Sequence, residues 1–277
     1  MGMRISTNVA SINAQRTLST SQREIGKSMA QLSSGSRITK AADDAAGLGI
    51  SENLKSQIRS YAQASRNAND GISMVQVAEG GLGEISNILT RMRELGVQSA
   101  SDTLGDKERS YLNVEVQQLK SEMERIAKTT RFGTQSLLDG TGKEFEIQVG
   151  INNNKGEDRI SFDSSTLNAT LDELGVGSVD FGSKEGAHEA LSLVDDAQSK
   201  VASFRANIGA LQNRFQSTVE NLGVQHENLA AANSRIRDAD IAASSAEMAR
   251  NSVLLNASTS TLAQANMQPQ LAMKLIG

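Results

Sequence analysis

The sequence predicts a mainly α-helical protein, a long antiparallel helical coiled-coil bundle with a small β-hairpin region in the middle of the chain. Apolar residues recur at steps of three, four or seven over most of the 277 residues, which is the period of amphipathic and coiled-coil helices. Only 3% of the residues are aromatic, and the chain has no Trp and one Pro. Burial must therefore depend on Leu, Ile, Val, Met and Ala, which suits closely packed helices.

The N-terminal half predicts three helices. The first runs to about residue 31, where the sequence SSGSR breaks the pattern. The second, about 44–100, is the longest, and glycines such as Gly71 weaken it without ending it. A helix of that length would measure roughly 80 Å, and lengths beyond about 25 residues indicate a coiled coil or long bundle. The third covers about 105–128, with Asp106 as a candidate cap.

The middle of the chain changes from helical to strand-like patterning. Residues 145–149 and 159–163 alternate apolar and polar side chains, and an Asn-rich loop joins them. The helical period returns at about 186–233 and again after residue 240. We expect residues 1–43 and 235–277 to form a terminal-helix domain. Residues 44–234 should form a helical bundle domain with its β region at about 140–185.

Composition excludes several classes of function. Without Cys there is no disulfide framework and no thiolate metal site. The net charge of −4 gives no reason to expect a nucleic-acid partner. The sequence has no run of about 18 apolar residues, so it predicts no membrane span. The N-terminal residues lack the apolar segment of a cleaved secretion signal, so we expect none.

Candidate catalytic motifs have simpler interpretations. His226-Glu begins like a zinc-protease helix, but Ala230 stands where the second His is required. Two pairs of acids could hold a metal, but Asp is also the residue that starts helices. These pairs are Asp43 with Asp44, and Asp238 with Asp240. We expect no catalytic, cofactor or metal site, and no enzyme activity.

The terminal helices suggest assembly. Their apolar positions are interrupted by Ala and Ser, and helices of this kind pair weakly in isolation. We expect them to order by packing against other copies of the chain. The apolar residues predicted to make this subunit packing are Ile5, Val9, Ile12, Leu18, Ile25, Met29, Leu32, Ile241, Met248, Leu255, Leu262, Leu271 and Leu275.

Long stretches near both ends resemble bacterial flagellin. They are RISTNVASINAQRTL (4–18), LSSGSRITKAADDAAGLGIS (32–51), NANDGIS (67–73), QVAEGGL (76–82), SRIRDADIA (234–242) and QANMQPQ (264–270). The resemblance covers essentially the whole chain, and motifs of this length are highly specific. Residues 167–178 leave no room for the outer domain that many flagellins insert at about 165–185. The chain therefore resembles a near-minimal flagellin.

The resemblance implies a structural subunit of the bacterial flagellar filament, used for swimming motility. In the family the terminal helices form a paired inner layer around the filament lumen, and they are disordered in the free subunit until assembly orders them. The implied partners are many copies of itself, the flagellar cap, junction proteins and an export chaperone. Export would use the flagellar type III apparatus, which places the protein outside the cell without a cleaved signal.

The resemblance also implies a face that serves subunit packing and binds the vertebrate innate flagellin receptor. The segment TRMRELGVQ (90–98) matches this face, and Arg91, Leu95 and Glu115 carry over by position. Arg91 could pair with receptor carboxylates, and Leu95 would supply apolar contact. Gly96 stands where Ala is common in the family, and we expect it to loosen the helix.

Two other functions compete with a filament subunit. A hook–filament junction protein shares the style of the terminal helices but would adapt two structures without polymerising at length. A secreted helical-bundle enzyme or effector would need a catalytic constellation, and we identify none in the sequence. Polymerisation distinguishes the three.

Overall fold

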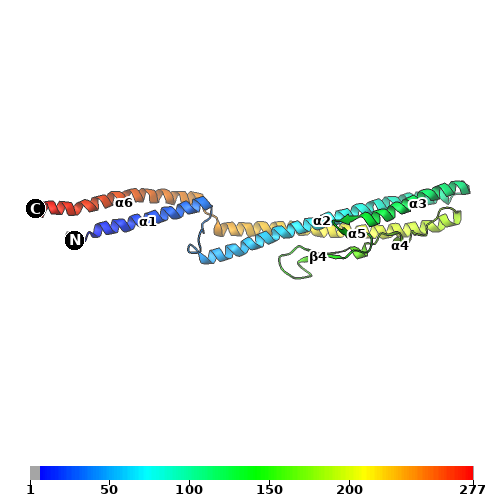
Figure 1. Ribbon diagram of the computed structural model, residues 1–277, viewed down its shortest axis with the longest axis horizontal. Helices are drawn as coiled ribbons and strands as arrows, with labels where there is room; N and C mark the ends of the chain where they lie inside the picture. The colour runs from blue at the N-terminus through cyan, green and yellow to red at the C-terminus, as the bar shows by residue number, and fades with distance from the viewer. Residues whose placement is uncertain (1–6, 277) are drawn as a thin grey trace. The chain divides into compact units, whose positions relative to one another are not determined.

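The computed structural model describes the backbone of residues 7–276 and the side chains of residues 7–267. The described chain is mainly helical (Figure 1), which confirms the predicted fold class. The helices are α1 (Val9–Ser34), α2 (Ala45–Ser99), α3 (Asp106–Thr129), α4 (Leu171–Leu174), α5 (Lys184–Arg237) and α6 (Ile241–Ile276). The strands are β1 (Arg131–Phe132), β2 (Gln135–Ser136), β3 (Glu144–Gln148) and β4 (Arg159–Asp163), with a short 3-10 helix at Ser164–Thr166.

The chain divides into two compact units. One comprises residues 58–227, and the other comprises the residues up to 57 and from 228 onwards. Both boundaries fall inside helices, because α2 and α5 contribute to each unit. The expected domains are divided at 43/44 and 234/235 and correspond to layers of an assembled filament, not to the compact units of a single chain. That division stays a prediction.

Polar caps set the starts of the terminal helices. The Asn8 side chain accepts a hydrogen bond from the Ser11 N–H at 3.1 Å and begins α1. Asp240 begins α6 by accepting from the N–H groups of Ala242 and Ala243, at 2.9 and 3.1 Å. A side-chain oxygen at these positions satisfies N–H groups that have no partner inside the helix, and the Asp240 carboxylate also complements the helix dipole.

The acidic pair Asp43 and Asp44 has a similar local role. Asp44 precedes α2 and accepts from the Gly47 N–H at 2.8 Å. Asp43 accepts from the backbone N–H groups of Thr39 and Lys40, both at 3.1 Å, and closes the turn before that helix. These bonds, after the one from the Thr39 hydroxyl, lower the pKa of Asp43. The carboxylates therefore organise turns and helix starts.

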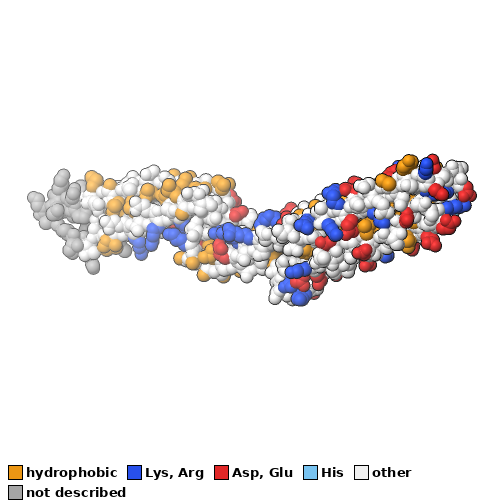
Figure 2. All heavy atoms as spheres, turned by 45° about the vertical axis from the view of Figure 1, so that its right-hand side comes forward, with side chains coloured by type: hydrophobic (Ala, Val, Ile, Leu, Met, Phe, Trp, Pro, Cys, Tyr) orange, Lys and Arg blue, Asp and Glu red, His pale blue; other side chains and the backbone are white. Residues whose placement is uncertain are grey.

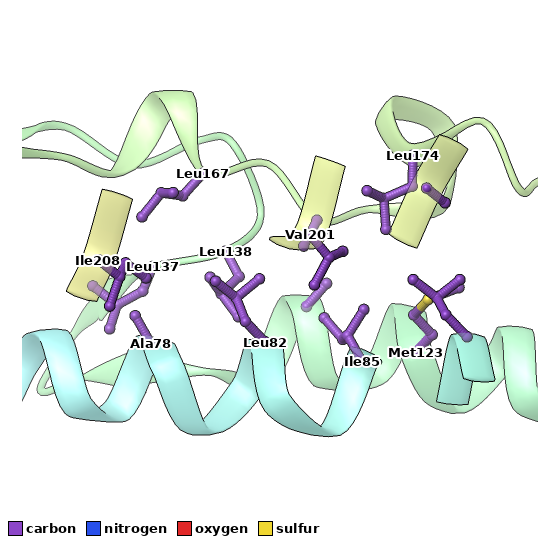
Figure 3. Packing of buried hydrophobic residues seen from close by; sticks show 14 of the residues in the cluster. Ala78, Leu82, Ile85, Met123, Leu137, Leu138, Leu167, Leu174, Val201 and Ile208 are labelled. Atoms are coloured by element: carbon purple, nitrogen blue, oxygen red, sulfur yellow. The ribbon is translucent and has the colours of Figure 1, made fainter. Parts of the chain in front are cut away.

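The unit of residues 58–227 has a dense hydrophobic core. Leu82 and Ile85 of α2 point toward side chains of α3 and α5, including Met123 and Val201 (Figure 3). Leu137 and Leu138, which follow β2, close the same core. The largest fully buried side chains of the described chain all belong to this unit: Phe181, Phe215, Leu82, Ile85, Leu89, Met92, Leu95, Met123, Leu137, Leu138, Leu174 and Ile208.

Two glycines of α2 allow aromatic rings to approach its backbone. A Cβ at Gly71 would lie 2.9 Å from Cζ of Phe215, and a Cβ at Gly96 would lie 3.0 Å from Cζ of Phe181. Contacts that short would force the rings to move, because the core is close-packed. The sequence predicts that Gly96 loosens the helix. In the structure, α2 continues through it to Ser99, and the missing side chain makes room for Phe181.

Buried cations anchor the connecting segments of the same unit. The Lys120 ammonium donates to the carbonyls of Gly177 and Val179, at 2.6 and 3.2 Å. Burial lowers its pKa. Arg109 is also buried and donates to the carbonyls of Ser99 and Ser101, both at 2.9 Å, just after α2 ends. Each cation thus donates to carbonyl groups that accept no hydrogen bond within a helix or a sheet.

The β region is a hairpin with an additional small ribbon. Strands β3 and β4 pair antiparallel in the predicted place, and the rings of Phe145 and Phe162 lie 6.1 Å apart between centroids. Strands β1 and β2, the 3-10 helix and α4 are not predicted by the sequence pattern. They are too short to show a period, since the longest of them has four residues.

Candidate assembly surfaces

Helices α1 and α6 lie side by side (Figure 1) and form one continuous seam. Along both helices, its buried and half-buried positions are spaced alternately three and four residues apart, as in a coiled coil. The seam consists of Ser11, Ala14, Leu18, Ser21, Ile25, Ser28 and Leu32 from α1, and Ser244, Met248, Asn251, Leu255, Ser258, Leu262 and Ala265 from α6.

The seam alternates large and small side chains. Its most buried members are serines and one alanine, with Ser21, Ser28, Ser244, Ser258 and Ala265 between 3% and 8% exposed. Large apolar residues occupy the alternate positions but remain half-buried. Small side chains bury little apolar area, and stabilisation from burial scales with that area. The pair is therefore closely fitted but weakly stabilised by its own seam.

The predicted packing residues divide into three groups. Six lie in the seam, namely Leu18, Ile25, Leu32, Met248, Leu255 and Leu262. Four are exposed, namely Val9, Ile12, Met29 and Ile241. Ile5 and the side chains of Leu271 and Leu275 lie outside the described residues.

Apolar side chains remain on the outside of this helix pair. Val9, Ile12, Val253 and Met267, which we call the outer apolar residues, are between 58% and 68% exposed. Figure 2 shows hydrophobic side chains on the visible face of the pair. The seven-residue spacing of apolar residues in α6 does not include Val253 and Met267, so the sequence pattern does not predict a packing role for them. Aliphatic residues that are exposed singly are common on protein surfaces, so these four are candidates for contact with a partner.

The turns between the terminal helices and their neighbours are hydrogen-bonded to each other. Ser36 and Asp238 form an isolated antiparallel bridge. The N–H of Arg37 donates to the carbonyl of Arg237 at 2.6 Å, and the N–H of Ala239 donates to Gly35 at 2.9 Å. Residues far apart in sequence thus fix where α1 ends and α6 begins.

The face expected to bind a receptor contains an ion-pair network. Arg91 of α2 contacts Glu115 of α3 at 2.9 Å and Glu94 at 3.0 Å. The hydrogen bonds that Arg91 donates, first to Glu94 and then to Glu115, raise the pKa of Arg91. Leu95 is only 1% exposed and belongs to the core beneath them. The interpretation of Leu95 as a surface contact is therefore corrected: its side chain faces the interior because its position on α2 shares the buried face with Met92.

The arrangement has the features of a structural helix assembly. Within the described residues, no helix combines the length and apolar character needed to cross a membrane. Over the same residues, no three His, Asp or Glu side chains cluster in a way that could hold a metal. What the described surface does offer is a weakly stabilised terminal helix pair with aliphatic side chains outside its seam. These features define a helical structural protein, with the terminal helix pair as its candidate surface for assembly.

Comparison with known proteins identifies the family. Residues 5–143 match the bacterial flagellin N-terminal helical region, and residues 191–276 match the bacterial flagellin C-terminal helical region. The chain belongs to the bacterial flagellin family. It is 44% identical over 274 residues to a flagellin of Halalkalibacterium halodurans, covering 99% of this chain and 100% of that protein. It is 40% identical over 285 residues to the flagellar filament core protein flaB2 of Brachyspira hyodysenteriae, with the same coverage.

Solved structures agree with this assignment. The crystal structure of Bacillus cereus flagellin matches with a TM-score of 0.50 and 33% identity, covering 61% of this chain and 94% of that one. A putative flagellar hook-associated protein from Vibrio parahaemolyticus matches with a TM-score of 0.59 at 18% identity, covering 71% of this chain and 100% of that one. At that identity the second match shows a shared fold alone.

Proposed function

We propose that this chain is a structural subunit that polymerises into the helical filament of the bacterial flagellum and serves swimming motility. The observation that carries the proposal is the α1/α6 pair, with small residues in its seam and exposed aliphatic residues outside it. Such a pair gains further buried apolar area when other copies cover its exposed residues. Membership of the flagellin family, which includes filament core proteins, supports the same function.

The terminal helices form the inner layer of the filament, and the remaining residues form the next layer. Because the α1/α6 seam is weak, its order is coupled to assembly, as in other segments that fold on binding. A chain whose ends are unfolded before assembly can pass through a narrow export channel, so the protein suits export through the flagellar type III apparatus. Its assembly partners are the flagellar cap, junction proteins and an export chaperone.

The α2–α3 face is the site for the vertebrate innate flagellin receptor. Arg91 and Glu115 are half-exposed and already pair with each other, so a receptor carboxylate would compete with Glu115 for the guanidinium. Leu95 acts from beneath by holding this part of α2 in place. Its contribution to recognition is therefore positional.

A hook–filament junction protein is the alternative, and no observation favours it. The likeness to the hook-associated protein is confined to the fold. The curated relatives described above are flagellins and filament core proteins over the full length of the chain.

Electron microscopy of the purified chain mixed with short filament seeds at neutral pH tests the function. A filament subunit should give long tubes of uniform width, because heterologous contacts whose rotation does not close repeat into an open helical polymer. Chains without seeds provide the control for spontaneous growth. Monomers alone, or short caps on the seeds, would contradict the proposal and favour the junction protein.

A further inference from the structure

A polar pocket lies where the loop that joins β3 to β4 meets helices α2 and α5. It has a volume of about 620 Å³, which is within the range of small-molecule sites. Its lining residues all lie between Tyr61 and Gln225, inside the compact unit of residues 58–227. The pocket therefore belongs to this unit and involves neither terminal helix.

The buried part of the lining is mostly apolar. Val149, Ile160 and Leu222 line the pocket and are between 2% and 5% exposed. Tyr61 is half-buried and adds an aromatic ring. An apolar interior with polar groups around it is the usual composition of a small-molecule site.

Asp158 fixes the loop that forms one wall of the pocket. It is 7% exposed, and its carboxylate accepts from the N–H groups of Asn154 and Asn152, at 3.0 and 3.4 Å. The Gln148 side chain donates to the carbonyls of Gly150 and Asn152, at 2.9 and 2.7 Å, and holds the same loop. A carboxylate can accept about four hydrogen bonds, so Asp158 keeps acceptor capacity for a ligand.

The outer part of the lining carries polar groups that no protein group satisfies. Among the described residues, the Arg214 guanidinium and the hydroxyl groups of Tyr61 and Ser217 have no hydrogen-bond partner. Gln225 donates its Nε2 to Oδ1 of Asn221. This bond leaves the Nδ2 of Asn221 as a donor and the Oε1 of Gln225 as an acceptor, so donors and acceptors lie close together on α5.

These groups distinguish between classes of ligand. An apolar ligand would cover the amides of Asn221 and Gln225 without replacing their hydrogen bonds to water. Arg214 disfavours a cation, and the carboxylates of Glu157 and Asp158 disfavour an anion. A sugar hydroxyl both donates and accepts hydrogen bonds, and the C–H faces of a sugar ring suit the buried apolar residues of the lining.

We propose that this pocket binds a neutral sugar of about one or two hexose units. The proposal goes beyond the filament function, because it concerns a ligand site in the 58–227 unit and does not depend on polymerisation. A hexose has about twelve non-hydrogen atoms, and ligands of that size in an open polar site bind with a Kd on the order of 1 mM.

A pair of serine variants tests the proposal. Ser217→Trp fills the pocket, whereas Ser203→Trp adds the same ring to an exposed position of α5 outside the lining. The unassembled full-length chain is titrated with the methyl glycosides of glucose, galactose, mannose and N-acetylglucosamine, and binding is followed by saturation-transfer NMR. At least one glycoside should bind the unchanged chain and Ser203→Trp equally, and Ser217→Trp at least about tenfold more weakly.

Three results would overturn the proposal. The first is no binding of any of the four glycosides at about 50 mM, well above the expected Kd. The second is equal binding by Ser217→Trp, since the sugar then lies elsewhere. The third is binding of glucuronate alone, which would show an anion site at Arg214. Circular dichroism checks that both variants keep the helical content of the unchanged chain.

Seeded growth of the same proteins separates this proposal from the filament function. If no glycoside binds and Ser217→Trp alone fails to elongate seeds, the pocket is a contact between copies, and the sugar proposal is overturned while the filament function stands. If the unchanged chain binds a glycoside but never elongates seeds, the filament function is overturned and the sugar site stands.

Discussion

At the residue scale, side-chain type and burial are less closely linked than the sequence pattern implies. Ser21 and Ser28 are among the most buried residues of α1, whereas Val9 and Ile12 are exposed. The seven-residue spacing of the serines could have indicated a seam, but a pattern read from apolar residues passes over them. An apolar residue of α1 can face α6 of the same chain or point outwards to another copy. The fit between the two helices decides between these positions, and the sequence pattern of one helix does not show that fit.

The burial of Leu95 leads to a prediction about stability. Leu95→Ala should lower the free energy of unfolding of the 58–227 unit by about 2–5 kcal/mol, because it leaves a cavity in a close-packed core. Chemical denaturation followed by circular dichroism measures the change. Arg91→Ala is the surface control, and it should leave the free energy of unfolding nearly unchanged because the ion pair is exposed.

These variants also separate recognition from packing. Loss of receptor response in Arg91→Ala at normal stability would place Arg91 in the contact. Loss in Leu95→Ala should be accompanied by destabilisation. An equally stable Leu95→Ala protein would contradict the burial of this side chain.

At the element scale, periodicity predicts the long helices well. The helix predicted at 44–100 is α2, Ala45–Ser99, and the strands predicted at 145–149 and 159–163 lie within two residues of β3 and β4. Helix α5 continues to Arg237, beyond the predicted end at 233, because the bridge between Ser36 and Asp238 fixes the turn. That bridge joins residues about two hundred positions apart, so local sequence does not predict it.

The last turns of α6 lead to a prediction about assembly. Asn8 donates to the carbonyl of Ala265 at 2.8 Å, and the Ser11 hydroxyl donates to Asn266 at 2.8 Å. Deleting residues 264–277 removes both contacts. Filament formation should be abolished, while the 58–227 unit keeps its helicity because its core does not include these residues.

Seeded growth and circular dichroism measure the two effects of the deletion. Deleting Gly277 alone is the control for shortening the chain, and it should support growth. Normal filaments from the longer deletion would exclude a role for the end of α6 in packing.

At the scale of the whole molecule, the two compact units differ in how they are stabilised. The unit of residues 58–227 contains all of the largest fully buried side chains of the described chain. The other unit is held by a seam whose most buried members are serine and alanine, by hydrogen-bonded turns and by its helix caps. The composition of the whole sequence does not show this difference. It becomes visible only when the buried residues are assigned to the two units.

This difference predicts unequal protection from amide hydrogen exchange. In the free subunit, amides of α1 and α6 should exchange at least about a hundredfold faster than those of the buried stretch of α2 around Leu82 and Leu89, because opening a weak seam exposes little apolar area. Hydrogen–deuterium exchange with mass spectrometry measures both regions in one sample. In filaments the α1 and α6 peptides should become protected, since other copies then cover the outer apolar residues. Equal protection of the two regions in the free subunit would show that the terminal pair is stable without partners, and assembly would then join helices that are already ordered.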